Sequence, residues 1–184
     1  MRSKDRLCAL VVGPTNKNNI FKFGKVNRTE FMQFKNEIAG VLIKHLHTIN
    51  IIPASGIPLE IAKDYKRLGG KVIGYIPRGY SGLEKNFNSC SEVREIDWDW
   101  TSLNTCLSLK GDLIVGFGIS AGTFVEIAYT RYHRDYLNKN LPILLDERTI
   151  SSRLNLELEQ TIDINYFSSM RELNKLFYNI RNGK

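Results

Sequence analysis

The sequence lacks the patterns that mark metalloproteins, secreted proteins and membrane proteins. Its three cysteines, Cys8, Cys90 and Cys106, form no C-x-x-C pair, and its three histidines show no ligand spacing. We therefore expect reduced thiols, no metal site and no cofactor. No apolar run reaches the roughly 18–20 residues that span a bilayer, and the N-terminal segment lacks the layout of a signal peptide. These absences predict a cytoplasmic protein without a membrane partner.

Signatures of nucleic-acid binding and of classical NAD binding are also missing. The net charge of +7 suits anionic ligands, but no block of five or more like charges occurs and no aromatic-basic recognition motif is present. The full G-x-G-x-x-G fingerprint is absent. We expect no nucleic-acid partner; a small anionic ligand remains open, with an ordinary solvated basic surface as the alternative.

At 184 residues, with 42% apolar and 24% charged residues, the chain has the size and composition of one domain spanning 1–184. Short apolar runs alternate with segments of helical spacing, which is typical of parallel strands joined by helices. We expect an α/β fold, a Rossmann-like doubly wound parallel sheet in three α/β/α layers. The expected strands are 7–12, 48–52, 71–76, 91–96, 113–117 and 141–145. The expected helices are 29–47, 58–68, 97–109, 123–132 and 168–181, whereas 16–27 reads as a loop, either a lid or an insertion, and 147–164 has no assignment.

Turns rich in small residues follow several of these strands. Right-handed crossovers place the carboxyl ends of parallel strands along one edge of the sheet, so the turns should converge there. The first amides of a helix lack intrahelical partners and carry partial positive charge, which favours phosphate. We predict that the turn entering helix 123–132 binds a phosphate and that two other turns form a second wall. The predicted phosphate residues are Gly118, Ser120, Gly122 and Thr123, and those of the second wall are Gly13, Thr15, Ser55 and Gly56.

Glu126 is the candidate catalytic residue, because it places a carboxylate in the expected first turn of that helix. Its alternative role is structural: Thr123 and Glu126 have the spacing of a capping box, as do Ser169 and Glu172. The residues of the two walls have the alternative of ordinary turns and helix caps. Trp98 and Trp100 are candidates for stacking on a base, with packing as the alternative.

Two segments resemble one known family. Ser55–Pro77, SGIPLEIAKDYKRLGGKVIGYIP, resembles its stretch G-G-x-M-E-A…A-x-x-x-G-G-x-V-I-G-I-x-P, and Gly118–Glu126, GISAGTFVE, resembles its signature P-G-G-x-G-T-x-x-E. The helix and strand that follow Glu126 also look like the family's. The chain thus resembles the Lonely Guy (LOG)-like family, within the Rossmann-like nucleotide-binding SLOG group.

The resemblance implies a nucleotide ligand whose phosphate contacts the glycine turn. Some relatives are phosphoribohydrolases, which cleave a nucleoside 5′-monophosphate with a glutamate and an upstream arginine; others bind molybdenum cofactor or nucleotide-derived signals. Ile119 stands at a family glycine, and Leu103 appears at the arginine's place, with Arg78 as a candidate substitute. The segment around Glu126 also resembles nucleoside 2-deoxyribosyltransferases, in which the glutamate is the nucleophile.

Two functions follow from these patterns. The first is a binding protein or sensor for a nucleotide or phosphoribosyl ligand, with a molybdenum cofactor carrier as a variant that uses the same phosphate site. The second is an N-glycosidase that uses Glu126. The apolar helical faces at 31–45 and 168–180, together with the family resemblance, further predict a homodimer.

Overall fold

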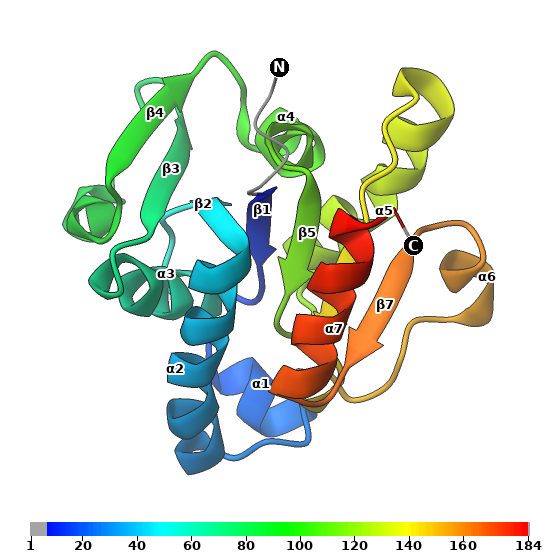
Figure 1. Cartoon of the computed structure of the whole chain (residues 1–184). Helices are drawn as coiled ribbons and strands as arrows, with labels where there is room; N and C mark the ends of the chain where they lie inside the picture. The colour runs from blue at the N-terminus through cyan, green and yellow to red at the C-terminus, as the bar shows by residue number, and fades with distance from the viewer. Residues whose placement is uncertain (1–6, 184) are drawn as a thin grey trace.

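The computed structural model describes residues 7–183 and has one seven-stranded parallel sheet with strand order β4-β3-β2-β1-β5-β6-β7 (Figure 1). The chain runs from β1 outward in one direction and then returns to the other side of β1 through β5. This confirms the predicted Rossmann-like α/β class and places a topological switch between β1 and β5. The strands are β1 (Leu7–Val12), β2 (Leu46–Ile51), β3 (Lys71–Pro77), β4 (Glu92–Ile96), β5 (Leu113–Gly116), β6 (Ile143–Asp146) and β7 (Ile164–Phe167).

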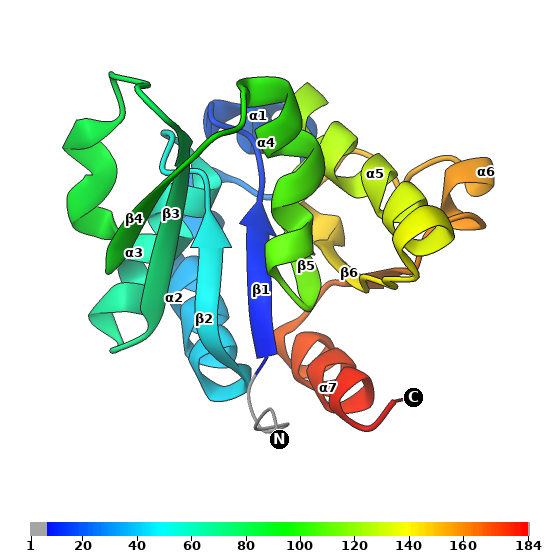
Figure 2. The same cartoon turned by 90° about the horizontal axis from the view of Figure 1, so that it is seen from above.

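Helices cover both faces of the sheet, in the three layers that the sequence predicts (Figures 1 and 2). Ala9 and Val11 of β1 join a core cluster with α2, α3 and α7, whereas Leu10 and Val12 join a second cluster with α4 and α5. Alternate side chains of a strand point to opposite faces, so β1 must be apolar throughout. The helices are α1 (Asn18–Phe23), α2 (Arg28–His45), α3 (Ile57–Arg67), α4 (Trp100–Cys106), α5 (Ala121–Leu137), α6 (Leu156–Glu159) and α7 (Met170–Arg181), with 3-10 turns η1 (Glu84–Ser89), η2 (Leu107–Lys110) and η3 (Glu147–Thr149).

The segment 16–27, predicted as a loop, contains helix α1. Its Ile20 is buried in the core, and the Lys25 amide donates to the carbonyl oxygen of Arg148 over 2.7 Å. Both figures place α1 at the carboxyl end of β1. The segment is thus packed against the sheet edge, because the buried side chains of Ile20 and Val26 and this backbone contact hold it there.

Helix α2 ends and strand β2 begins two residues earlier than predicted. Helix α2 begins with a capping box between Asn27 and Glu30 and ends at His45, whose ring stacks on Phe177 of α7 at 4.8 Å between centroids. The strand therefore starts at Leu46. The apolar faces of α2 and α7, which suggested a homodimer, are covered largely within one chain, where both helices pack on the sheet and on each other.

The unassigned segment 147–164 contains the 3-10 turn η3, the short helix α6 and the first residue of β7. Strand β7 pairs with β6 at the sheet edge, and most of its side chains are only half-buried. Partial exposure permits polar residues, and four residues are too few to show a period. In the part of the chain that the structure describes, no helix is long and apolar enough to cross a membrane.

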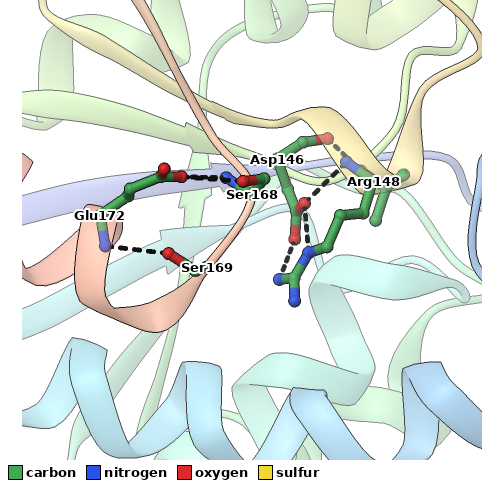
Figure 3. A network of polar contacts seen from close by, with 6 residues as sticks. Asp146, Arg148, Ser168, Ser169 and Glu172 are labelled. Carbon is green, nitrogen blue, oxygen red and sulfur yellow. Dashed lines mark hydrogen bonds and ion pairs between the residues drawn. The ribbon is translucent and has the colours of Figure 1, made fainter.

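Polar contacts fix the carboxyl ends of β6 and β7 (Figure 3). The fully buried Asp146 accepts two hydrogen bonds from the Arg148 guanidinium, at 2.9 and 2.7 Å. At the start of α7, Ser169 caps the Glu172 amide as predicted, but the Glu172 carboxylate accepts from Ser168 instead of Ser169. The predicted capping box is therefore only half formed.

Candidate functional site

A cleft of about 440 Å³ opens at the carboxyl edge of the sheet, next to the switch between β1 and β5. Open α/β sheets bind their ligands at this place, because the chain diverges there to opposite faces. Four segments form the walls: the end of β1, the start of α3, the β3–β4 loop with α4, and the start of α5. The lining residues are Val11, Val12, Gly13, Thr15, Ile52, Ala54, Ser55, Pro58, Tyr80, Leu83, Trp100, Asn104, Ser120, Ala121, Gly122, Thr123 and Glu126.

Most of the predicted site residues come together in this cleft, and two do not. Gly56 and Gly118 lie outside the lining and have positive φ angles of 108° and 82°. A Cβ on Gly56 would meet the Pro14 carbonyl oxygen at 2.2 Å, and one on Gly118 would meet the Ile20 side chain at 2.6 Å. Both glycines are therefore required by the turns themselves. The predicted residues that line the cleft are Gly13, Thr15, Ser55, Ser120, Gly122, Thr123 and Glu126.

Gly122 has no such structural reason. A Cβ there would meet nothing closer than 4.0 Å, where Asn104 Oδ1 and Ser120 Oγ lie. In a helix interior, glycine lowers helix stability by roughly 0.8–1.0 kcal/mol relative to alanine. Gly122 lies in the first turn of α5. The absence of a side chain leaves the backbone accessible from the cleft, so Gly122 fits close contact with a ligand.

The start of α5 differs from the prediction in the residue that caps the helix. Ser120, not Thr123, is the N-cap, and its hydroxyl accepts from the Thr123 amide at 3.3 Å. The first intrahelical bond runs from the Phe124 amide to the Ser120 carbonyl. The Ala121 and Gly122 amides precede that bond and border the cleft. The predicted capping box of Thr123 with Glu126 is wrong, and Glu126 lies beyond the first turn.

Glu126 is left without a capping role and lines the cleft with 6% of its surface exposed. Within residues 7–183, no hydrogen bond or ion pair engages its carboxyl group. Burial raises the pKa of Glu126 from an ordinary 4.5 to about 8. The side chain is therefore largely protonated at neutral pH and is able to donate as well as accept. A buried carboxyl group without a partner in a cleft is a marker of a functional site.

The opposite wall is aromatic. Tyr80 and Trp100 meet edge to face at 4.7 Å between ring centroids, and both line the cleft. Trp98, the other stacking candidate, instead lies 5.3 Å from the Lys110 ammonium and is not part of the lining. Tyr80 was missed from the sequence because it lies in the irregular segment 78–91. An aromatic residue soon after a strand end was the only signal that it offered.

No lysine, arginine or histidine is among the described residues that line the cleft. Arg78, proposed as a substitute for the family arginine, is exposed and pairs with Asp97 at 2.8 Å outside the lining. Leu103, the residue aligned with that arginine, is fully buried in the core, whereas Asn104 faces the cleft. Positive potential within the cleft therefore comes from helix N-termini and backbone amides.

Sequence comparison identifies no matching family model and no matching curated protein. Among solved structures, TM1055, a structural-genomics target, superposes with a TM-score of 0.68 at 18% identity, over 94% of this chain and 98% of that chain. The Moco carrier protein of Chlamydomonas reinhardtii gives 0.67 at 16% identity, over 97% and 99%. The molybdenum cofactor binding protein of Rippkaea orientalis gives 0.61 at 16% identity, over 95% and 97%.

At these identities the likeness establishes the fold, which this chain shares over nearly its whole length with these proteins. The neighbours share the α/β fold that the predicted family resemblance implies.

The raised pKa of Glu126 predicts a pH-dependent effect of Glu126→Gln on stability. A folded-state pKa above the unfolded value stabilises the fold below pH 4.5, and that contribution is lost as pH rises through about 8. Glutamine removes the cost of ionisation, so the variant should be more stable than the wild type by roughly 2–4 kcal/mol at pH 7 and by almost nothing near pH 4.5.

Urea titrations at several pH values measure this difference. The control is Glu37→Gln, the same change on an exposed side chain of α2, where the substitution relieves no burial and stability at pH 7 should stay near that of the wild type. A stability difference for Glu126→Gln that does not change between pH 4.5 and pH 8 would mean that Glu126 ionises normally in the fold.

Proposed function

We propose that residues 1–184 form one domain that binds a nucleotide or phosphoribosyl-type ligand in the cleft, with the phosphate at the start of α5. The observation that carries this proposal is the pairing of two accessible helix-start amides, at Ala121 and Gly122, with the unpartnered, buried Glu126. The amides suit an anion, and a protonated carboxyl group suits a hydroxyl or carbonyl of the same ligand.

The dimensions and composition of the cleft narrow the ligand class. Its volume falls within the roughly 300–1,000 Å³ of small-molecule sites, and its aromatic wall suits a flat ring. Because none of the described residues that line it carries a cationic side chain, a monophosphate suits this cleft better than a di- or triphosphate. A molybdenum cofactor, which structural neighbours are named for carrying, is a second ligand that combines a ring system with a phosphate.

Gly122→Ala is expected to weaken nucleotide binding without weakening the fold. The added methyl group has room in the free protein but occupies the side from which a phosphate approaches the amides. We expect at least a tenfold loss of affinity, measured by calorimetry against nucleoside monophosphates, ribose 5-phosphate and nucleosides.

Gly40→Ala is the matched control. Gly40 lies in α2 with nothing within 4 Å of an added Cβ, so it tests the helix effect alone and should leave affinity unchanged. A panel without any ligand, or equal affinities of Gly122→Ala and the wild type, would contradict the proposed phosphate position.

An N-glycosidase is the second candidate function, and the protonation of Glu126 is the observation in its favour. A nucleophile must be ionised, whereas a general acid must hold a proton, so a pKa of about 8 suits Glu126 as an acid. In such a reaction water attacks the anomeric carbon, the C–N bond breaks, and Glu126 donates a proton to the departing base. The proton that the attacking water loses passes to the solvent, from which Glu126 is reprotonated. No arginine is among the lining residues in the part of the chain that the structure describes, which removes one source of charge stabilisation, so we rank this function second.

The glycosidase hypothesis predicts release of free base from AMP or dAMP. With Glu126 as the acid, the rate should fall as pH rises through about 8 and should drop at least a hundredfold in Glu126→Gln. Chromatography of the products measures both effects. A rate that instead rises through this pH would indicate a nucleophile, and no base from any monophosphate would exclude the activity for the compounds tested.

We also propose a cytoplasmic location and a homodimer whose interface is formed by α5. Tyr129, Tyr132 and Tyr136 lie along one face of this helix and contact one another through their rings at 5.3 and 6.1 Å. All three are exposed, and Phe124 and Leu137 add exposed apolar area on the same helix. An antiparallel pair of α5 helices would bury these side chains, and exposed aromatic patches often mark such interfaces.

Tyr132→Glu combined with Tyr136→Glu should shift the protein from dimer toward monomer in sedimentation velocity runs. Two buried carboxylates on each copy would face one another across the proposed two-fold axis. Tyr178→Glu is the control, because Tyr178 is equally exposed but lies on α7. A wild-type protein that stays monomeric at all concentrations contradicts the dimer.

A further inference from the structure

A second cavity, of about 260 Å³, lies beside the first at the same edge of the sheet. The two share no lining residue, but Pro14 and Ile119, which line the second cavity, alternate along the chain with Gly13, Thr15 and Ser120 of the first cleft. The other walls come from α1 and from the segment between β6 and α6. The lining residues are Pro14, Asn19, Ile20, Phe23, Ile119, Thr149, Ile150, Ser151, Ser152, Arg153 and Leu154.

The base of this cavity is apolar, and an aromatic ring stands at its rim. Ile20 and Ile150 are buried there, whereas Phe23 keeps 56% of its surface exposed. The Lys22 ammonium lies 5.1 Å from the ring centroid of Phe23. The ring is available to pack against the apolar part of a ligand that enters the cavity.

Arg153 is the one charged residue among the described residues that line this cavity. Glu147 accepts from its Nε and Nη2 at 3.0 and 3.3 Å, and its guanidinium lies 4.7 Å from the ring centroid of Tyr166. Within residues 7–183, no hydrogen bond engages Nη1. The guanidinium is held in place yet keeps donors for an anion.

The segment that carries Arg153 is also fixed. The Leu154 amide donates to the Tyr166 hydroxyl at 3.0 Å, and that hydroxyl donates to Glu159. Ser151 and Ser152 are exposed beside it, and within the described chain no hydrogen bond engages their hydroxyl groups. An apolar base, an oriented cation and hydroxyl donors therefore line one cavity that is open to solvent.

We infer that this cavity is a second ligand site, which binds a small anion with an apolar ring, such as an aromatic carboxylate or phosphate ester. The volume lies just below that of drug-sized sites, so one ring and its anionic group are the largest ligand that it suits. The ring packs between Phe23 and the buried isoleucines, and the anion pairs with Arg153. Glu147 already neutralises part of that charge, so ring and anion are both needed for binding.

Backbone amide NMR of the labelled full chain tests this site with four probes: phenyl phosphate, benzoate, benzyl alcohol and inorganic phosphate. The first two should shift amides near Phe23 and in the segment 151–154 saturably, with at least fivefold higher affinity than the last two. Failure of both ring-bearing anions to shift these amides, up to their solubility limits, overturns the inference.

Phe23→Ser and Arg153→Gln should each weaken phenyl phosphate binding at least fivefold. Tyr178→Ser and Arg131→Gln are matched controls. Tyr178 is 62% exposed, against 56% for Phe23. The Arg131 side chain is 50% exposed and paired with Asp135, against 57% for the Arg153 side chain paired with Glu147. The controls should stay within twofold of the wild type. Equal losses in variants and controls would overturn the assignment.

Gly122→Ala separates this inference from the proposed function. Phenyl phosphate binding at the second cavity should survive in that variant, whereas nucleotide binding at the first cleft should not. Shifts confined to residues 120–126, and abolished by Gly122→Ala, would mean that the anion occupies the first cleft and that the second cavity is not a site.

Discussion

The close packing of three turns at the carboxyl edge of the sheet determines where the cleft lies. The turn after β1 contacts both the start of α3 and the turn after β5: the Ile57 amide donates to the Pro14 carbonyl at 3.2 Å, and the Phe117 amide donates to Val12 at 3.0 Å. A Cβ on Gly13 would stand 2.6 Å from the Phe117 carbonyl oxygen. Only residues without a side chain allow backbones to approach so closely. The walls of the cleft are therefore held at fixed separation by the backbone itself.

The fixed backbone of the cleft walls explains why the fold tolerates Glu126, a residue that lowers its stability. A carboxyl group without a partner favours unfolding at neutral pH, and packing elsewhere in the two core clusters must offset that cost. A leucine or glutamine at residue 126 would serve the fold better. Glu126 lines the same cleft as Gly122, a glycine that the fold itself does not require. Two locally unfavourable choices that meet in one cavity are expected where function, not stability, selects the residues.

Most strands and most helices could be predicted from the sequence because their patterns are local. The apolar run at Leu7–Val12 and the spacing from Phe31 to Leu42 reflect burial against one sheet. Helix α1 could not be predicted. One buried residue, Ile20, and the contact of the Lys25 amide just after the helix with Arg148 hold it, and neither produces a periodic sequence pattern. The same applies to β7, whose half-buried residues have no clear alternation.

The position of the cleft could be predicted from the sequence, but the geometry of its walls could be predicted less well. Convergence of the turns follows from parallel topology, so the residues around Gly13, Ser55 and Gly122 could be grouped without coordinates. The cap of α5 could not be fixed, because Ser120 and Thr123 are both good N-caps and only backbone geometry separates them. That one choice decides the role of Glu126: a cap at Thr123 would give its carboxylate a backbone partner, whereas the cap at Ser120 leaves it facing the cleft.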